Sequence, residues 1–239
     1  MPVPYIPMEM FSVSSNIEVE IYNIDGIGPI FICDNFYTNP DAIHDMLIDA
    51  HVPAFKKNYL DKNLPSFNFE KYYDCRLTIE DNYSNDTSQN NNQRIIWDAI
   101  DASFDMCKVV RSPEPGRFNL FKWIETPTQN FQQFPHTDSD TKVAGIVYLD
   151  KHSEGGTAFY HVDGKLQIET TLGYKEENDI RVDLNALGIK YDIVDAKYNR
   201  LVVYPGWYMH GGYISNHEVY TKNWRLNQVF FWNVKRDDR

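Results

Sequence analysis

The sequence predicts a mainly β fold with helical support, and three observations lead to this expectation. Aromatic residues make up 15% of the chain, and aromatic and β-branched side chains favour sheets. Short apolar segments separated by turn residues gather in the C-terminal half, whereas segments with helical spacing gather in the N-terminal half. Such a division is typical of an antiparallel sheet structure with helices packed on it. A chain of 239 residues suits one domain, 1–239, with N-terminal strand and helix support over 1–116 and a β core over 117–232.

The N-terminal half is expected to supply one strand and two helices. The run IGPIFICDNF, residues 27–36, is short, apolar and β-prone, so it predicts a strand. Apolar residues at helical spacing predict a helix over 41–51, with Asn39 as its cap and Pro40 at its first position. A further apolar stripe predicts a second helix over 93–106.

Five segments of the C-terminal half are expected to be strands. Each is short, rich in β-branched and aromatic residues, and separated from the next by turn residues. These segments are 117–125, 142–150, 156–162, 200–207 and 224–232. The glycine pair at the beginning of the third segment is expected to allow a tight turn between strands.

The composition argues against several classes of protein. The net charge of −11, from 34 acidic residues against 23 Lys and Arg, disfavours binding to a nucleic-acid backbone. Cys33, Cys75 and Cys107 form no CxxC pair, which argues against a zinc site or a disulfide framework and favours free thiols in a reducing compartment. No apolar run approaches the roughly 18 residues of a membrane span, and the N-terminus lacks a signal-peptide pattern. We therefore expect a soluble protein without membrane association.

A candidate metal site begins with the segment FPHTDSD, residues 134–140. On an extended strand residues i and i+2 point the same way, so His136 and Asp138 can converge on one ion. An HxD pair alone carries little weight, because it occurs by chance in many proteins. The segment YPGWYMHGG, residues 204–212, adds His210 after a strand and a Pro-Gly turn, and its last two glycines leave space beside the backbone. Two His and one carboxylate on one face of a metal form the facial triad of non-haem Fe(II) oxygenases.

The other five histidines are expected to be surface or structural residues. They are His44, His51, His152, His161 and His217. His152, in a turn, and His161, at a strand end, are the only rivals to His210, and neither has as good a context for a metal. His217 is expected in the turn before a strand over 219–231.

Arg225 is the candidate anion-binding residue. It follows His210 within the strand WRLNQVFFW, where an unpaired Arg would be costly. A guanidinium fork binds a carboxylate at two points, and 2-oxoglutarate ends in a C5 carboxylate. We therefore expect Arg225 to point inward at an anion, and the alternative is a surface Arg on an edge strand.

Taken together, these motifs resemble the 2-oxoglutarate/Fe(II)-dependent oxygenase superfamily, in its prolyl-4-hydroxylase-like branch. The matching pieces are HTD (136–138), YLD (148–150), EGGTAFY (154–160), NRLVVYPGWYMHGG (199–212) and WRLNQ (224–228). Each piece is weak by itself, but five in the order of the family are a strong signal. The resemblance covers 117–232, and FICDNFYTNPDAI (31–43) is similar to the opening of related phage and bacterial proteins of unassigned function.

The resemblance implies a double-stranded β-helix, or jelly roll, with Fe(II) at its mouth. His136, Asp138 and His210 carry over as the iron ligands, and Arg225 as the partner of the C5 carboxylate of 2-oxoglutarate, with ascorbate as reductant in vitro. Prolyl hydroxylases carry Lys at that anchor, so Arg225 argues against a prolyl substrate. Related halogenases lack the carboxylate ligand, so Asp138 implies hydroxylation or desaturation of a C–H bond, with release of succinate and CO2. The implied location is the cytoplasm, or the host cytoplasm if the chain is phage-encoded.

Further residues are candidates for contact with co-substrate or substrate, and for each the alternative is ordinary core. They are Asn119 with its neighbours Phe121 and Trp123, Asn227, Tyr148 and, at the mouth, Trp207 and Tyr208. Asn227 shares a strand face with Arg225. Tyr148 can reach a carboxylate of 2-oxoglutarate, as a Tyr does in some relatives.

Two other readings compete with an oxygenase. A non-catalytic jelly-roll module, structural or binding, would be expected to have lost a ligand or the anchoring Arg. A cupin-like metal protein would present more histidines and would leave Arg225 unexplained. The substrate stays open between a peptide and a small molecule, with nucleic acid disfavoured by the charge, and the oligomeric state stays open too. Segments 52–92 and 163–199 are the candidates for shaping the substrate side.

Overall fold

The computed structural model describes residues 8–15, 19–51, 72–78, 107–109, 117–123, 131–133, 135–138, 142–162, 181–183 and 189–236. Strands dominate these residues and pair antiparallel, so the mainly β prediction is confirmed. The helix expected over 93–106 lies outside the described residues. Among the described helices, none has the length and apolar character needed to cross a membrane.

The larger sheet has eight strands in the order β1-β2-β11-β7-β13-β5-β3, and β4 pairs with β13. These strands are β1 (Val19–Ile24), β2 (Gly28–Cys33), β3 (Tyr72–Thr78), β4 (Cys107–Val109), β5 (Arg117–Trp123), β7 (Lys142–Tyr148), β11 (Leu201–Pro205) and β13 (Arg225–Arg236). The strand expected over 27–36 is β2, and four of the five C-terminal segments become β5, β7, β11 and β13. Strands from both halves of the chain therefore share one sheet.

Two smaller sheets accompany the larger one. A three-stranded sheet has the order β10-β8-β12, formed by β10 (Tyr191–Asp195), β8 (Gly156–Tyr160) and β12 (His210–Tyr213). The fifth expected C-terminal strand is β8. A two-stranded sheet pairs β6 (Phe131–Gln133) with β9 (Arg181–Asp183). Strands β9 and β10 both lie in the segment 163–199, which the sequence marked as a candidate for the substrate side.

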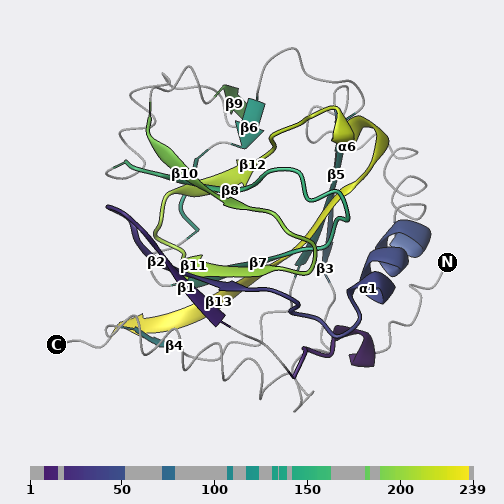
Figure 1. The fold of residues 1–239 in the computed structure, drawn as a ribbon, viewed down its shortest axis with the longest axis horizontal. Coiled ribbons are helices and arrows are strands. Elements are labelled where there is room, and N and C mark those ends of the chain that lie inside the picture. Colours follow the sequence, from purple (N-terminus) through teal and green to yellow (C-terminus); the bar gives the residue numbers. More distant parts are fainter. Residues whose placement is uncertain are drawn as a thin grey trace.

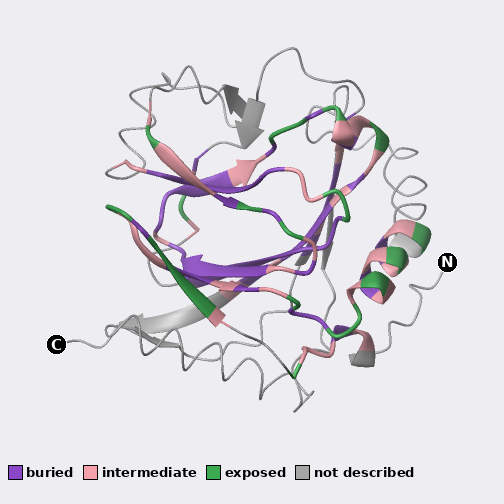
Figure 2. Cartoon of the chain, in the orientation of Figure 1, coloured by how far each residue is buried: buried purple, intermediate pink, exposed green. Residues whose placement is uncertain are grey.

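The three-stranded sheet faces the larger sheet (Figure 1), and buried stretches of the two sheets face each other (Figure 2). A cluster of buried apolar residues joins the two sheets. Val202 lies opposite Ile146 in the pairing of β11 with β7, so the two side chains share the inner face. They belong to one buried cluster with Phe159 of β8 and Val194 of β10. Burying this cluster holds the two sheets face to face.

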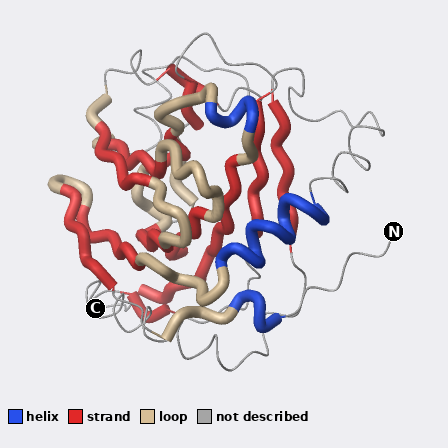
Figure 3. The backbone as a smooth tube through the Cα atoms, turned by 45° about the vertical axis from the view of Figure 1, so that its right-hand side comes forward, coloured by secondary structure: helices blue, strands red, loops and turns tan. Residues whose placement is uncertain are grey.

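The outer face of the larger sheet is covered by N-terminal helices (Figures 1 and 3). These are the 3-10 helix η1 (Met8–Phe11), the α-helix α1 (Pro40–Met46) and its π-helical continuation η2 (Leu47–His51). Ile43 and Leu47 are fully buried in a cluster with Val147 of β7. The expected cap is confirmed, because Asn39 Oδ1 accepts a hydrogen bond from Ala42 N at 3.3 Å.

The fold differs from the expectation in several strands and at the start of one strand. Strands β1, β3, β4, β6, β10 and β12 were not predicted, and β1 gives no alternating pattern because four of its six residues are exposed. The strand expected over 219–231 is wrong at its start, since Val219–Lys222 form the short helix α6 and β13 begins at Arg225. Tyr220 of α6 is fully buried against β5, and this tertiary contact decides the local structure.

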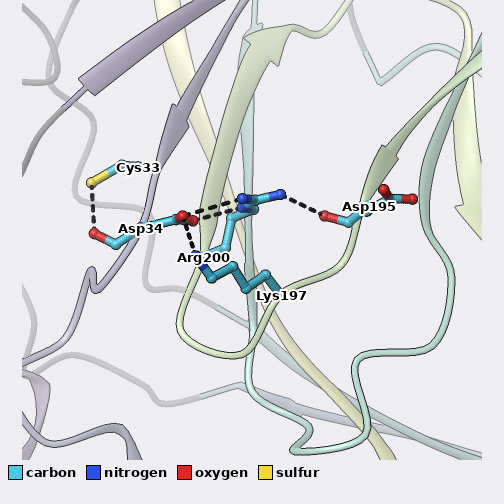
Figure 4. A network of polar contacts seen from close by, with 5 residues as sticks. All are labelled: Cys33, Asp34, Asp195, Lys197 and Arg200. Carbon is cyan, nitrogen blue, oxygen red and sulfur yellow. Dashed lines mark hydrogen bonds and ion pairs between the residues drawn. The ribbon is translucent and has the colours of Figure 1, made fainter.

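An ion-pair network ties the end of β2 to the turn before β11 (Figure 4). Arg200 donates to both carboxylate oxygens of Asp34, from Nε at 2.6 Å and from Nη2 at 3.2 Å. Lys197 Nζ donates to Asp34 Oδ2 at 2.6 Å. These hydrogen bonds, above all the one from Arg200, lower the pKa of Asp34 to about 2. The carboxylate is therefore more stable as an anion in the folded chain than in the unfolded chain.

Replacing Asp34 with Asn is expected to lower the free energy of unfolding at pH 7 by about 1–2 kcal/mol, allowing for solvent screening. The folded pKa lies below the ordinary value of 3.8, so the contribution is complete above that value and is lost as the pH falls through about 2. Urea unfolding at several pH values measures the difference. The exposed Asp25→Asn variant is the control, and a wild-type advantage that persists undiminished at pH 2 would contradict the assignment.

Candidate metal centre

The two segments that carry the expected ligands are held together by backbone hydrogen bonds. His136 N donates to His210 O and His210 N donates to His136 O, each at 2.9 Å. Asp138 N donates to Gly206 O, also at 2.9 Å. Residues 135–138 thereby lie beside the start of β12, at the edge of the three-stranded sheet. Residues more than seventy positions apart in the chain are brought to one point by this pairing.

The side chains of His136, Asp138 and His210 converge. One ligand atom from each of the three lies within 4.8 Å of the others. His210 Nε2 is 3.3 Å from Asp138 Oδ2, and His136 Nε2 is 3.7 Å from Asp138 Oδ1. Within the part of the chain that the structure describes, no other group of three such side chains comes this close.

The surroundings of His210 fit a metal ligand. His210 Nδ1 lies 2.9 Å from the carbonyl oxygen of Tyr208, so Nδ1 carries the proton and donates it. The other ring nitrogen, Nε2, faces Asp138 and is the atom left to bind a metal. A backbone carbonyl that fixes the second ring nitrogen is the usual partner of metal-binding His. The donor set of two imidazoles and one carboxylate, with Nδ1 of His210 facing a carbonyl oxygen, therefore fits a divalent metal ion such as Fe(II).

The site has one buried side and one open side. The side chain of His210 is 6% exposed and that of Asp138 is 12% exposed, whereas that of His136 is 38% exposed. The exposed side of the cluster therefore lies at His136, while His210 is backed by the core. Tyr204 forms part of that backing, with its ring centroid 4.6 Å from that of His210. Burial, and then the charge of Asp138, hold the pKa of Tyr204 well above its usual range, so its hydroxyl stays protonated.

The candidate co-substrate residues share the inner face of the larger sheet. Asn227 lies opposite both Tyr148 and Asn119 in the strand pairings, so the three side chains are neighbours. Arg225 lies on the same face because it is two residues from Asn227 along β13. Its Nη2 donates to Gly156 O at 3.3 Å. Among the described residues this is the single hydrogen bond of a guanidinium that has five N–H donors.

Two polar pairs lie beside Arg225. The hydroxyls of Tyr148 and Thr157 are 2.6 Å apart and both residues are buried. Burial raises the pKa of Tyr148 to about 12. Asn119 Nδ2 donates to Asn227 Oδ1 at 3.0 Å, while Asn119 Oδ1 is buried without a hydrogen-bond partner among the described residues. Because amide oxygen and nitrogen positions are interchangeable in such a pair, the observation is that one polar end of Asn119 is unsatisfied.

The remaining candidates lie nearby, in packing positions. Phe121 and Trp123 are buried with Tyr220 in a cluster at the end of β5. Trp207 is half-buried between the two main clusters, and Tyr208 is buried. Neither Thr157 nor Tyr204 was singled out from the sequence, although both lie inside quoted motifs. Only their positions in the structure distinguish Thr157 and Tyr204 from ordinary core residues, so the sequence could not have identified them.

Three of the other histidines lie in surface or structural positions. His161 is hydrogen-bonded to Asp192 of β10, and His217 Nδ1 accepts a hydrogen bond from Trp123 Nε1 at 3.1 Å. His152 is exposed in the turn after β7. None of the three joins the cluster of His136, Asp138 and His210.

The glycine pair Gly155-Gly156 allows close approach of backbone as well as a turn. A Cβ atom on Gly156 would lie 2.0 Å from Val194 O, and one on Gly155 would lie 2.1 Å from Tyr213 O. Gly155 also has a φ of +86°. The pair thus lets β8 approach its two neighbours and presents Gly156 O to Arg225. The tight turn expected from sequence is only part of its role.

Comparison with solved structures finds matches of low sequence identity that extend over most of this chain. HygX from Streptomyces hygroscopicus, with nickel and 2-oxoglutarate bound, is 11% identical with a TM-score of 0.46, over 85% of this chain and 82% of that chain. AviO1 from Streptomyces viridochromogenes is 15% identical with a TM-score of 0.42, over 81% and 85%. A prolyl-4-hydroxylase from Pseudomonas putida is 13% identical with a TM-score of 0.37, over 83% and 100%.

Comparison at the level of sequence gives one family. No curated protein sequence matches the chain. The model of the family described as "Family of unknown function (DUF6445)" matches residues 15–181. This match covers more than half of the 239 residues, and the chain therefore belongs to the family DUF6445.

Proposed function

We propose that the chain is an Fe(II)- and 2-oxoglutarate-dependent oxygenase, whose iron is held by His136, Asp138 and His210. The observation that carries the proposal is the convergence of these three side chains within 4.8 Å, with the tautomer of His210 fixed by Tyr208 O. Two facing antiparallel sheets, with the cluster at the edge of the smaller one, support a double-stranded β-helix as the architecture.

Iron and 2-oxoglutarate, when bound, supply the oxidising chemistry, in which 2-oxoglutarate and oxygen yield succinate and CO2 while a substrate C–H bond is hydroxylated. The chain's own residues bind and orient. Arg225 offers the free N–H groups of its guanidinium to the C5 carboxylate, beside the hydroxyls of Tyr148 and Thr157. Asn119 and Asn227 offer the adjacent amide groups. Burial of these groups strengthens each polar contact by excluding water.

The outcome of the reaction is proposed to be hydroxylation of a peptide or a small molecule. Asp138 would hold the metal where related halogenases have no carboxylate ligand, and this favours hydroxylation over halogenation. The strand β9, from the segment 163–199, pairs with β6 only three residues before His136, and this supports a role for that segment at the substrate side. A non-catalytic module of the same fold is the competing proposal.

Succinate release distinguishes an enzyme from a non-catalytic module. Purified protein with Fe(II), ascorbate and 2-oxoglutarate is expected to form succinate slowly even without substrate. Calorimetry with Ni(II) in place of iron should show that 2-oxoglutarate binds only when the metal is present or binds more tightly then. Absence of binding for both Fe(II) and 2-oxoglutarate in folded wild-type protein would overturn the oxygenase proposal.

Replacing Arg225 with Gln is expected to weaken 2-oxoglutarate binding about 100-fold, because a charge-assisted fork to the carboxylate is lost. The affinity for the metal should stay unchanged, since Arg225 is not one of the ligands. Arg225→Lys keeps the charge but not the fork and should fall between Gln and wild type. Calorimetry measures both affinities, and equal loss of metal and 2-oxoglutarate would contradict the assigned role.

A further inference from the structure

Asp150 is a buried carboxylate to which the proposed function gives no role. It is 1% exposed and lies two residues after the end of β7. Tyr148 lies opposite Asn227, and Leu149 N donates to Leu226 O at 2.9 Å, so the pairing of β7 with β13 continues beyond the strand. The next pair in this register is Asp150 with Arg225. Opposite residues share a face, so Asp150 and Arg225 lie side by side on the inner face of the sheet.

The Asp150 carboxylate is held by groups other than Arg225. Oδ1 accepts hydrogen bonds from His152 N at 3.1 Å and from Ser153 N at 2.8 Å. The hydroxyl of Tyr220, a fully buried residue of α6, lies 3.2 Å from each carboxylate oxygen. No ion pair within 4.0 Å joins Asp150 to Arg225 in the described structure, although the two charges are neighbours. The turn and the tyrosine thus keep the carboxylate in place.

The two charges still influence each other. Burial raises the pKa of Asp150, and the guanidinium of Arg225 is the strongest of the groups that oppose this rise. Arg225 donates one N–H to Gly156 O, and its other N–H groups are available to a ligand. A carboxylate in direct contact with the fork would compete with any incoming anion. A carboxylate held further away reduces the attraction for an anion without blocking the fork.

We propose that Asp150 is a positioning residue that sets the anion affinity of the Arg225 pocket, held beside the guanidinium but out of contact by Tyr220 and the turn 151–153. This inference rests on the proposed function, because it takes the anion to be the C5 carboxylate of 2-oxoglutarate. Succinate carries the same carboxylate, so the same negative charge weakens the hold on the product. A moderate anchor lets the product leave, while the 2-oxo acid gains additional affinity by chelating the metal.

Replacing Asp150 and replacing Tyr220 are expected to change the anion affinity of the Arg225 pocket in opposite directions. A purely structural role for the two residues would not produce changes of opposite sign. In Asp150→Asn the amide oxygen can still accept from the turn while the charge is removed. Binding of both 2-oxoglutarate and succinate is expected to tighten on the order of tenfold. In Tyr220→Phe the carboxylate is released toward Arg225, and binding of both is expected to weaken several-fold. The double variant should behave like Asp150→Asn, because no carboxylate remains to be released.

Calorimetry on Ni(II)-loaded protein with 2-oxoglutarate and with succinate measures these affinities, and metal affinity is measured separately and should not change. Unchanged or weaker binding in Asp150→Asn, or shifts of the same sign in the two single variants, would overturn the inference and leave the oxygenase proposal standing. If Asp150→Asn does not fold, unchanged or tighter binding in Tyr220→Phe would overturn it equally. Failure of the wild type itself to bind 2-oxoglutarate would instead remove the proposed function, and this inference with it.

Discussion

Replacement of Asp138 with Ala is expected to abolish succinate formation and to weaken metal binding by more than about 100-fold. Loss of a residue that only supports a metal ligand weakens binding by up to about 100-fold, and loss of a direct ligand should have a larger effect. Asp138 is the one carboxylate of the three and lies between the two histidines, 3.3 Å from His210 Nε2 and 3.7 Å from His136 Nε2. Without Asp138 the site would keep two imidazole nitrogens but would lose the negative charge that favours a divalent cation. Activity is measured as succinate release, and metal affinity by calorimetry with Ni(II).

The fold of the Asp138→Ala variant should be kept, because the backbone hydrogen bond from Asp138 N to Gly206 O does not need the side chain. His136→Ala is expected to give the same loss. His152→Ala, at an exposed histidine outside the cluster, is the matched control and should keep full metal binding. A variant that lacks Asp138 and still binds metal as tightly as wild type would contradict the ligand assignment.

Replacement of Gly155 with Ala is expected to lower the free energy of unfolding by more than about 3 kcal/mol, through overpacking and backbone strain together. The new Cβ would lie 2.1 Å from Tyr213 O and 2.7 Å from Ile214 Cα, both of them backbone atoms. The neighbouring strand cannot yield easily, because Tyr213 is paired with Gly156 across β12 and β8. For a chain of this size such a loss lowers Tm by roughly 6–12 °C.

Gly26→Ala is the matched control for this prediction. Gly26 has a φ of +76°, close to the +86° of Gly155, so the backbone cost of adding a side chain is similar. Its new Cβ would meet only the His161 ring, at 3.5 Å, which is ordinary contact. The difference between the two variants in thermal unfolding therefore measures the steric part alone. Equal changes in Tm would show that the crowding at Gly155 is relieved.

The secondary structure could be predicted wherever the residues that determine it lie within one short stretch of sequence. The strand β2 and the helix that begins at Pro40 follow from apolar spacing and from the cap Asn39, whose hydrogen bond to Ala42 spans only three residues. The strand β1 could not be predicted, because its residues are largely exposed and it is held mainly by pairing with β2. The start of β13 was misplaced because burial of Tyr220 against β5, a contact between distant parts of the chain, selects a helical turn.

The same division holds for the candidate site. The sequence by itself determined which side chains are able to bind a metal and a carboxylate, since His136, Asp138, His210 and Arg225 were recognisable from residue type, spacing and motif order. Their roles as ligands and anchor stay predictions, but the structure does bring His136, Asp138 and His210 together and places Arg225 beside Gly156 O.

Only the tertiary structure decided which other groups surround that chemistry. The register of β7 with β13, continued past the strand by the hydrogen bond from Leu149 N to Leu226 O, places Asp150 beside Arg225. The packing of the two sheets places Tyr204 against His210. The glycine pair at 155–156 turned out to let backbones that are distant in the chain approach one another closely. The physical reason is common to all of these. Hydrogen-bond register and steric contact between strands depend on which segments become neighbours. The sequence of a single segment does not reveal which other segment will pack or pair with it.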